Sequence, residues 1–143
     1  MMIVVLDTNV VISGILIPGS PPGKIVDLWA DGAITVAVSP ALFEEYLGVL
    51  LRPKFQGVGS IEERQKLLES FLSLANTVTV LPESLLDVIT EDPPDNRVLE
   101  CAAASSAGCI VSGDRHLLAL ERLAATLILK PAVFLEKYFG SRR

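Results

Sequence analysis

The chain has 143 residues, half of them hydrophobic and a fifth charged, with a formal net charge of −5. This length and composition predict one globular domain over residues 1–143 with a sizeable core, and they exclude a disordered chain. The negative charge argues against a sequence-independent nucleic-acid coat, which needs a basic face, and no apolar run is long enough to span a bilayer.

Taken in chain order, the N-terminal "MMIVVL" has no positive flank and meets Asp7 too soon for a signal peptide, so we expect a cytoplasmic protein without a membrane partner. Short apolar runs then alternate with helix-period segments. The predicted strands are 3–6, 34–38, 78–81, 109–111 and 126–129. The predicted helices are 10–17, 24–30, 40–51, 61–75, 95–107, 116–123 and 132–138. This alternation predicts an α/β fold with a parallel sheet covered by helices on both faces.

The predicted loops 18–23, 52–59 and 90–96 are too short to be interdomain linkers.

The same periodicity predicts which residues lie in the core. Both cysteines, Cys101 and Cys109, have apolar neighbours and no CxxC spacing, so we expect free buried thiols. Four aromatic residues fall within helical apolar patterns and are predicted to lie in the core: Trp29, Phe43, Phe71 and Phe134.

Polar residues follow the first strand in the stretch "IVVLDTNVVISG". Asp7, Thr8 and Asn9 are all good helix N-caps, so the triplet is explained by the start of the next helix. An acid at the carboxyl end of a central strand also lies where open α/β sheets bind ligands. This stretch alone does not decide between the two explanations.

The segment after the second strand, "VAVSPALFEEYLGVLLRPK", carries two glutamates. Ser39 is predicted as an N-cap with Pro40 as the first helical residue, which places Glu44 and Glu45 about one turn into the helix. The two side chains lie on opposite margins of the apolar arc, so periodicity does not choose between them. Both also fit a solvated helix face.

Two further regions also place acids after a strand or in the first turn of a helix. Asp92 before Pro93 resembles an N-cap, whereas Asp95 lies one turn before Leu99 and is predicted to project along the packed face. In "CIVSGDRHLLAL", Asp114 follows a strand and is also a candidate N-cap. In a parallel sheet the carboxyl ends of strands share one edge, so these acids can converge there.

Clustered carboxylates repel one another unless a cation neutralises them, and Mg²⁺ or Mn²⁺ are usual partners for oxygen ligands. Such a site suits metal-assisted phosphodiester hydrolysis, which needs no histidine base. His116 is the only histidine, so a catalytic triad or a histidine-rich metal site has little to use. We therefore expect carboxylates to carry any chemistry.

Four segments, in this order and spacing, resemble the PIN domain family, in particular its branch of ribonuclease toxins from toxin–antitoxin pairs. They are "VVLDTNVVIS", "VSPALFEEYLGVLLRPK", "EDPPDNRVLECA" and "IVSGDRHLLAL…ILKPAVFLEKY". The resemblance implies a five-stranded parallel sheet of order 3-2-1-4-5 in an α/β/α sandwich. It also implies a ribonuclease that depends on Mg²⁺ or Mn²⁺, a small antitoxin partner and a homodimer.

Carried over residue by residue, the resemblance assigns the metal-binding and catalytic acids to Asp7, Glu45, Asp95 and Asp114. It thereby prefers Glu45 over Glu44. Polar support is assigned to Thr8, Asn9 and Ser112, where many members have threonine in place of Ser112. Asp92 is a nearby acid that could assist, although its capping role is the preferred interpretation.

Two other classes of function compete with the nuclease. Aspartyl-phosphate transferases commonly place a second aspartate two residues after the first, where this chain has Asn9. Receiver-type regulatory domains need adjacent acids near the first strand, which are lacking here, although Lys130 follows the last strand. A silent PIN-like module that binds RNA or protein would have lost an acid, whereas all four acidic positions are filled.

Overall fold

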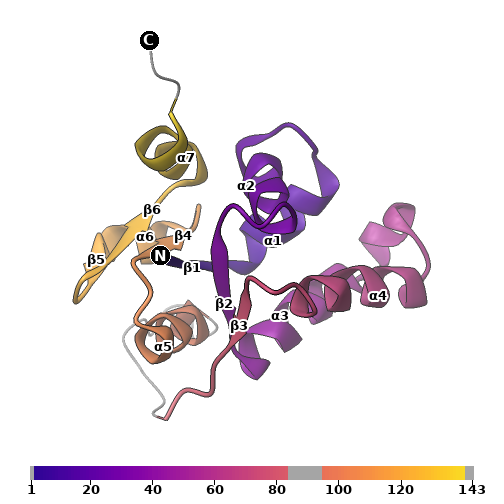
Figure 1. Cartoon of the computed structure of the whole chain (residues 1–143). Coiled ribbons are helices and arrows are strands. Elements are labelled where there is room, and N and C mark those ends of the chain that lie inside the picture. Colours follow the sequence, from indigo (N-terminus) through magenta and orange to yellow (C-terminus); the bar gives the residue numbers. More distant parts are fainter. Residues whose placement is uncertain (1, 84–94, 141–143) are drawn as a thin grey trace.

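A six-stranded sheet forms the centre of the computed structural model, which describes residues 2–83 and 95–140 (Figure 1). Its order is β3-β2-β1-β4-β6-β5, and every pairing is parallel except that of β5 with β6. The strands are β1 (Ile3–Leu6), β2 (Thr35–Val38), β3 (Thr77–Thr79), β4 (Cys109–Val111), β5 (Arg122–Leu123) and β6 (Thr126–Leu129). The middle strands β2 and β4 are buried throughout, as expected for strands covered on both faces.

The five predicted strands and their order are confirmed, with β6 as the fifth, but the prediction of five strands in all was incomplete. The added strand β5 lies inside the segment 116–123 that was predicted to be helical. The helix there ends early because Glu121 adopts a φ of 59°, and a second positive φ of 53° at Ala124 turns the chain back onto β6. A strand of two residues is too short to produce an alternating pattern.

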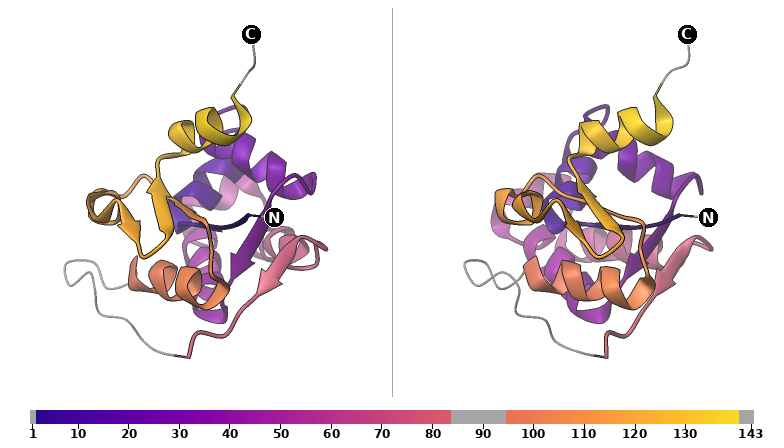
Figure 2. Two further views of the ribbon diagram at one scale, coloured as in Figure 1. Left: turned by 60° about the vertical axis from the view of Figure 1, so that its left-hand side comes forward. Right: turned by 90° about the vertical axis from the view of Figure 1, so that its left-hand side faces the viewer.

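The remaining predicted helices are found within a few residues of their predicted limits. The helices of the described residues are α1 (Thr8–Leu16), α2 (Pro21–Ala30), α3 (Pro40–Leu50), α4 (Ile61–Leu72), α5 (Asp95–Ser105), the shortened α6 (Arg115–Leu120) and α7 (Pro131–Phe139), with a 3₁₀ helix η1 (Pro53–Val58) inside the predicted loop 52–59. Figure 2 shows α2 and α7 together on one side of the sheet and α5 on the other. Over the described residues, no helix has the length and apolar character needed to cross a membrane.

The predicted aromatic core is confirmed. Trp29 and Phe134 are fully buried, Phe71 is buried, and Phe43 packs against the core while partly exposed. The Trp29 and Phe71 rings lie 4.6 Å apart between centroids, and the Trp29 indole N–H donates to Thr77 Oγ1 at 2.9 Å. The indole therefore ties α2 to the edge strand β3 through both apolar and polar contacts.

Three neighbouring strands lead, within three residues, to a polar N-cap residue that starts the next helix. Asp7 caps α1 after β1, Ser39 caps α3 after β2, and Asp114 caps α6 after β4. Because β2, β1 and β4 are adjacent and parallel, these caps and the N-termini of three helices lie at one edge of the sheet. The fold thereby gathers polar side chains and helix dipoles at this edge.

Candidate functional site

Asp7 and Ser112 connect the ends of the two central strands. The Asp7 backbone N–H donates to the Val111 carbonyl at 3.0 Å, and the Asp7 side chain is 5% exposed. The Ser112 hydroxyl donates to Asp7 Oδ2 at 2.6 Å and accepts a hydrogen bond from the Asp114 backbone N–H at 2.9 Å. Ser112 thus fixes the positions of two acids at once.

The capping explanation for Asp7 and Asp114 is correct as far as local structure goes. Asp7 Oδ1 accepts from the Thr8 N–H at 2.8 Å, and Asp114 Oδ1 accepts from the His116 and Leu117 N–H groups at 2.8 and 3.3 Å. Each carboxylate oxygen has two lone pairs, so capping does not use up the acceptor capacity of either side chain. A cap and a metal ligand are therefore compatible roles for both residues.

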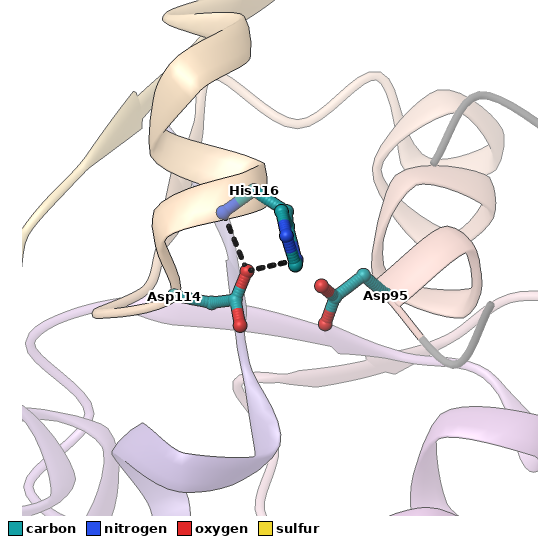
Figure 3. A group of neighbouring side chains, drawn as sticks. All are labelled: Asp95, Asp114 and His116. Carbon is teal, nitrogen blue, oxygen red and sulfur yellow. Dashed lines mark hydrogen bonds and ion pairs between the residues drawn. The ribbon is translucent and has the colours of Figure 1, made fainter. Parts of the chain in front are cut away.

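Asp95, Asp114 and His116 form what we call the acid–imidazole group. Each offers one ligand atom, and these atoms all lie within 4.8 Å of one another. Figure 3 shows the Asp95 carboxylate, at the start of α5, facing the Asp114 carboxylate and the His116 ring at the start of α6. Asp95 is 7% exposed, which confirms the prediction that it points into the packed face of its helix. The group therefore joins two segments that are distant in the sequence.

The acid–imidazole group fits a divalent cation. Two ionised carboxylates within 4.8 Å of each other repel, and a cation between them removes that repulsion. Ligand atoms lie about 2.0–2.6 Å from such ions, so atoms roughly 4–5 Å apart can share one ion. The His116 Nδ1 and Thr8 Oγ1 atoms are also buried without a hydrogen-bond partner among the residues described. Polar atoms left in this state next to acids are consistent with a ligand at this edge.

Glu45 lies outside the acid–imidazole group, beside Tyr46. The buried Tyr46 hydroxyl donates to the Leu6 carbonyl at the end of β1. Burial is the main cause that raises the Tyr46 pKa, followed by Cys101; the charges of Asp7 and Glu45 raise it further, so both carboxylates lie near this hydroxyl. Glu45 is half-buried whereas Glu44 is exposed, a difference that favours Glu45 as the inward-facing glutamate.

The structure thus brings Asp95 and Asp114 together and links Asp7 to Asp114 through Ser112. Glu45 and Asp7 both lie near the Tyr46 hydroxyl. Of the predicted supporting residues, Thr8 is buried and Asn9 is exposed on α1. Asp92 lies outside the described residues.

His116 was missed as a candidate site residue because a single histidine gave no multi-residue pattern. The usable signal was its position two residues after Asp114, at the start of a helix capped by that acid. Residues of a first helical turn that follow a strand end lie at the carboxyl edge of the sheet.

Comparison with known proteins finds a matching family, a related sequence and a solved structure with a similar fold. A family model for the PIN domain matches residues 3–116. The uncharacterized protein MJ1680 of Methanocaldococcus jannaschii is 36% identical over 119 residues, which cover 82% of this chain and 74% of that protein. Among solved structures, a chain of VapBC2 from Rickettsia felis, bound to a DNA fragment from their promoter, matches with a TM-score of 0.58. That match covers 89% of this chain and 97% of the other at 20% identity, so it shows a shared fold.

Proposed function

Because the chain belongs to the PIN domain family, we propose that it is a Mg²⁺- or Mn²⁺-dependent endoribonuclease, the toxin of a toxin–antitoxin pair. The observation that carries the proposal is the acid–imidazole group, placed beside Asp7 at the carboxyl edge of the central strands. Hydrolysis of a phosphodiester needs no covalent protein nucleophile if acids at this edge hold a divalent ion. The arrangement therefore suits the chemistry for which PIN domains are known.

Each acid has a defined part in this proposal. Asp95 and Asp114 hold the cation, and Asp7, fixed by Ser112, completes the oxygen ligands on the side of β1. Glu45 completes the site or orients the attacking water from the side of Tyr46. When bound, such an ion would act as a Lewis acid on the phosphate and would lower the pKa of the attacking water.

The chain's net charge of −5 is compatible with an RNA substrate. A cation held among acids presents positive charge to a phosphate, which reverses the local sign at the point of contact. An acidic protein therefore approaches RNA through its metal site rather than through a basic surface.

The biological role rests on the family resemblance and on the fold shared with the VapBC2 chain. By that resemblance we expect a cytoplasmic homodimer and a small antitoxin whose C-terminal segment covers the acidic edge. A second candidate function is a silent module that binds RNA or protein with the same acids and does not cut.

The test is cleavage of a mixed panel of fluorescent RNAs by antitoxin-free protein with Mg²⁺, Mn²⁺ or EDTA. We expect metal-dependent cleavage that is abolished in Asp7→Asn while the circular dichroism spectrum and thermal midpoint remain native. In the matched pair of adjacent glutamates, Glu45→Gln should slow cleavage and Glu44→Gln should leave it unchanged, since only Glu45 is half-buried.

Cleavage at the wild-type rate in purified Asp7→Asn would overturn the assignment of that residue. Binding of RNA by folded protein without cleavage under any metal would instead favour the silent module.

A further inference from the structure

We propose that the His116 imidazole is a nitrogen ligand of the cation held by Asp95 and Asp114, and that the site therefore prefers divalent transition-metal ions to Mg²⁺. This inference rests on the proposed function, since it concerns the same cation. It goes beyond it by assigning a ligand outside the four acids and by predicting which class of metal the site selects.

The position of the imidazole is the first argument. The His116 backbone N–H is bonded to Asp114 Oδ1 at 2.8 Å, so helix capping fixes where the residue begins. In the ring, Nδ1 lies 3.7 Å from the same Oδ1 and has no hydrogen-bond partner among the described residues. Nδ1 is itself buried, although the His116 side chain as a whole is 29% exposed. A bound cation would satisfy this nitrogen.

The second argument is that His116 faces two carboxylates rather than one. Asp114 comes from its own helix start, and Asp95 comes from α5 on the opposite side (Figure 3). Ligand atoms of all three residues lie within 4.8 Å of one another, so one ion can be shared by two carboxylate oxygens and one imidazole nitrogen.

The donor set then predicts the metal. Mg²⁺ is a hard ion that prefers oxygen ligands and keeps several waters, so a nitrogen ligand adds little to its affinity. Divalent transition-metal ions accept imidazole, and their affinity for a given site rises from Mn²⁺ to Co²⁺. We therefore expect the affinity of the site to increase in the order Mg²⁺, Mn²⁺, Co²⁺. His116 should account for much of this increase.

The test measures metal binding directly, without RNA. Calorimetric titration of the full chain with Mg²⁺, Mn²⁺ and Co²⁺ gives the ratio of Mg²⁺ to Mn²⁺ dissociation constants. In His116→Ala this ratio should fall by at least about tenfold, the lower end of the effect of residues that support a metal site. His116→Asp, which makes the ligands all oxygen, should keep tight binding but lose the preference. Arg115→Ala, in the same turn of α6, should leave the ratio unchanged.

A spectroscopic measurement identifies the ligand atom. Pulsed electron paramagnetic resonance of the Mn²⁺-loaded protein should show ¹⁴N modulation from a coordinated imidazole, and this modulation should be absent in His116→Ala and His116→Asp. The same metal ratio in wild type and His116→Ala, together with no ¹⁴N modulation, would overturn the inference.

The outcomes for the two proposals are separable. Metal-dependent RNA cleavage without nitrogen coordination would leave the ribonuclease standing and remove His116 as a ligand. Nitrogen coordination without cleavage of any RNA would support His116 as a ligand and count against the ribonuclease. Failure of all three ions to bind would overturn the ligand assignment.

Discussion

Arg64 and the acid–imidazole group are two buried charged sites with opposite surroundings. Arg64 is 4% exposed on α4, and its guanidinium donates to four backbone carbonyls. Nε reaches Gly59 and Ser60 at 2.9 and 3.4 Å, and Nη1 reaches Leu50 and Arg52 at 2.8 and 3.1 Å. Its positive charge therefore lies among the negative ends of peptide dipoles, where α3 ends, η1 begins and α4 starts.

In the acid–imidazole group, by contrast, two carboxylates of the same sign face each other with the His116 ring beside them (Figure 3). Glu100, on the same helix as Asp95, is also buried and pairs with Arg97 at 3.0 Å. Buried charge by itself thus does not indicate function. The sign of the neighbouring groups separates a charge that stabilises the fold from one that is arranged for a ligand.

The largest effect that would test this contrast is expected from Asp95→Asn or Asp114→Asn. Loss of a cation ligand should slow RNA cleavage by at least about a thousandfold, or roughly 4 kcal/mol of transition-state stabilisation. The free energy of unfolding should stay the same or rise in metal-free buffer, because one of two repelling charges is removed. Initial rates and urea unfolding measure the two effects.

The matched control is Asp27→Asn on the exposed face of α2, which should change neither the cleavage rate nor the free energy of unfolding. A large loss of stability in Asp95→Asn would show that this carboxylate is structural, as Arg64 is.

Arg64→Met should have the opposite profile. It leaves four carbonyls without their donor, so we expect the free energy of unfolding to fall by about 3 kcal/mol. Cleavage per folded molecule should be unchanged, since Arg64 holds helix ends rather than the sheet edge. Lys66→Met, an exposed site on the same helix, is the control and should stay within about 0.5 kcal/mol of wild type.

Ser112→Ala should lower both the stability and the cleavage rate, because the Ser112 hydroxyl bonds to a backbone group and to a site acid. The Asp7 carboxylate and the Asp114 N–H would each lose a buried partner, at a cost of about 1–2 kcal/mol in stability. Cleavage should slow by roughly 10- to 100-fold, as for residues that orient metal ligands. Ser112→Thr keeps the hydroxyl and should retain most activity; equal losses in both variants would contradict the role of that hydroxyl.

The smallest effect is expected at the two buried thiols. Burial raises the pKa of Cys101 to about 11 and of Cys109 to about 12, so both are protonated at pH 8 and should react with Ellman's reagent only after denaturation. The unfolded thiols ionise at their ordinary pKa of 9.0, below the folded values. The thiol contribution to stability should therefore be constant below pH 9 and decrease from there towards pH 11–12.

Urea midpoints measured between pH 7 and pH 10.5 test this dependence. The double variant Cys101→Ala, Cys109→Ala should lose the thiol contribution to the decline. Rapid reaction of the native protein with Ellman's reagent at pH 8 would contradict burial as the cause of the raised pKa values.

The amino-acid sequence by itself determined the parallel strands and most of the polar groups at their ends. Apolar runs such as 109–111 are readable because a strand buried on both faces has no polar alternation, and Ser39 before Pro40 is a local helix-start signal. Asp7 follows β1 directly and Asp114 lies three residues after the end of β4, so their common edge was predictable once the sheet was taken as parallel.

Only the tertiary structure decided which of these side chains meet. Asp95 faces His116 because α5 packs against the sheet near the start of α6, a contact between distant segments that leaves no periodic trace. Arg64 shares the buried face of α4 with Leu68 and Phe71, but the carbonyls that its guanidinium contacts come from the ends of three separate segments. Local rules describe neighbours within a turn or a strand, whereas a site forms where elements distant in the chain come into contact.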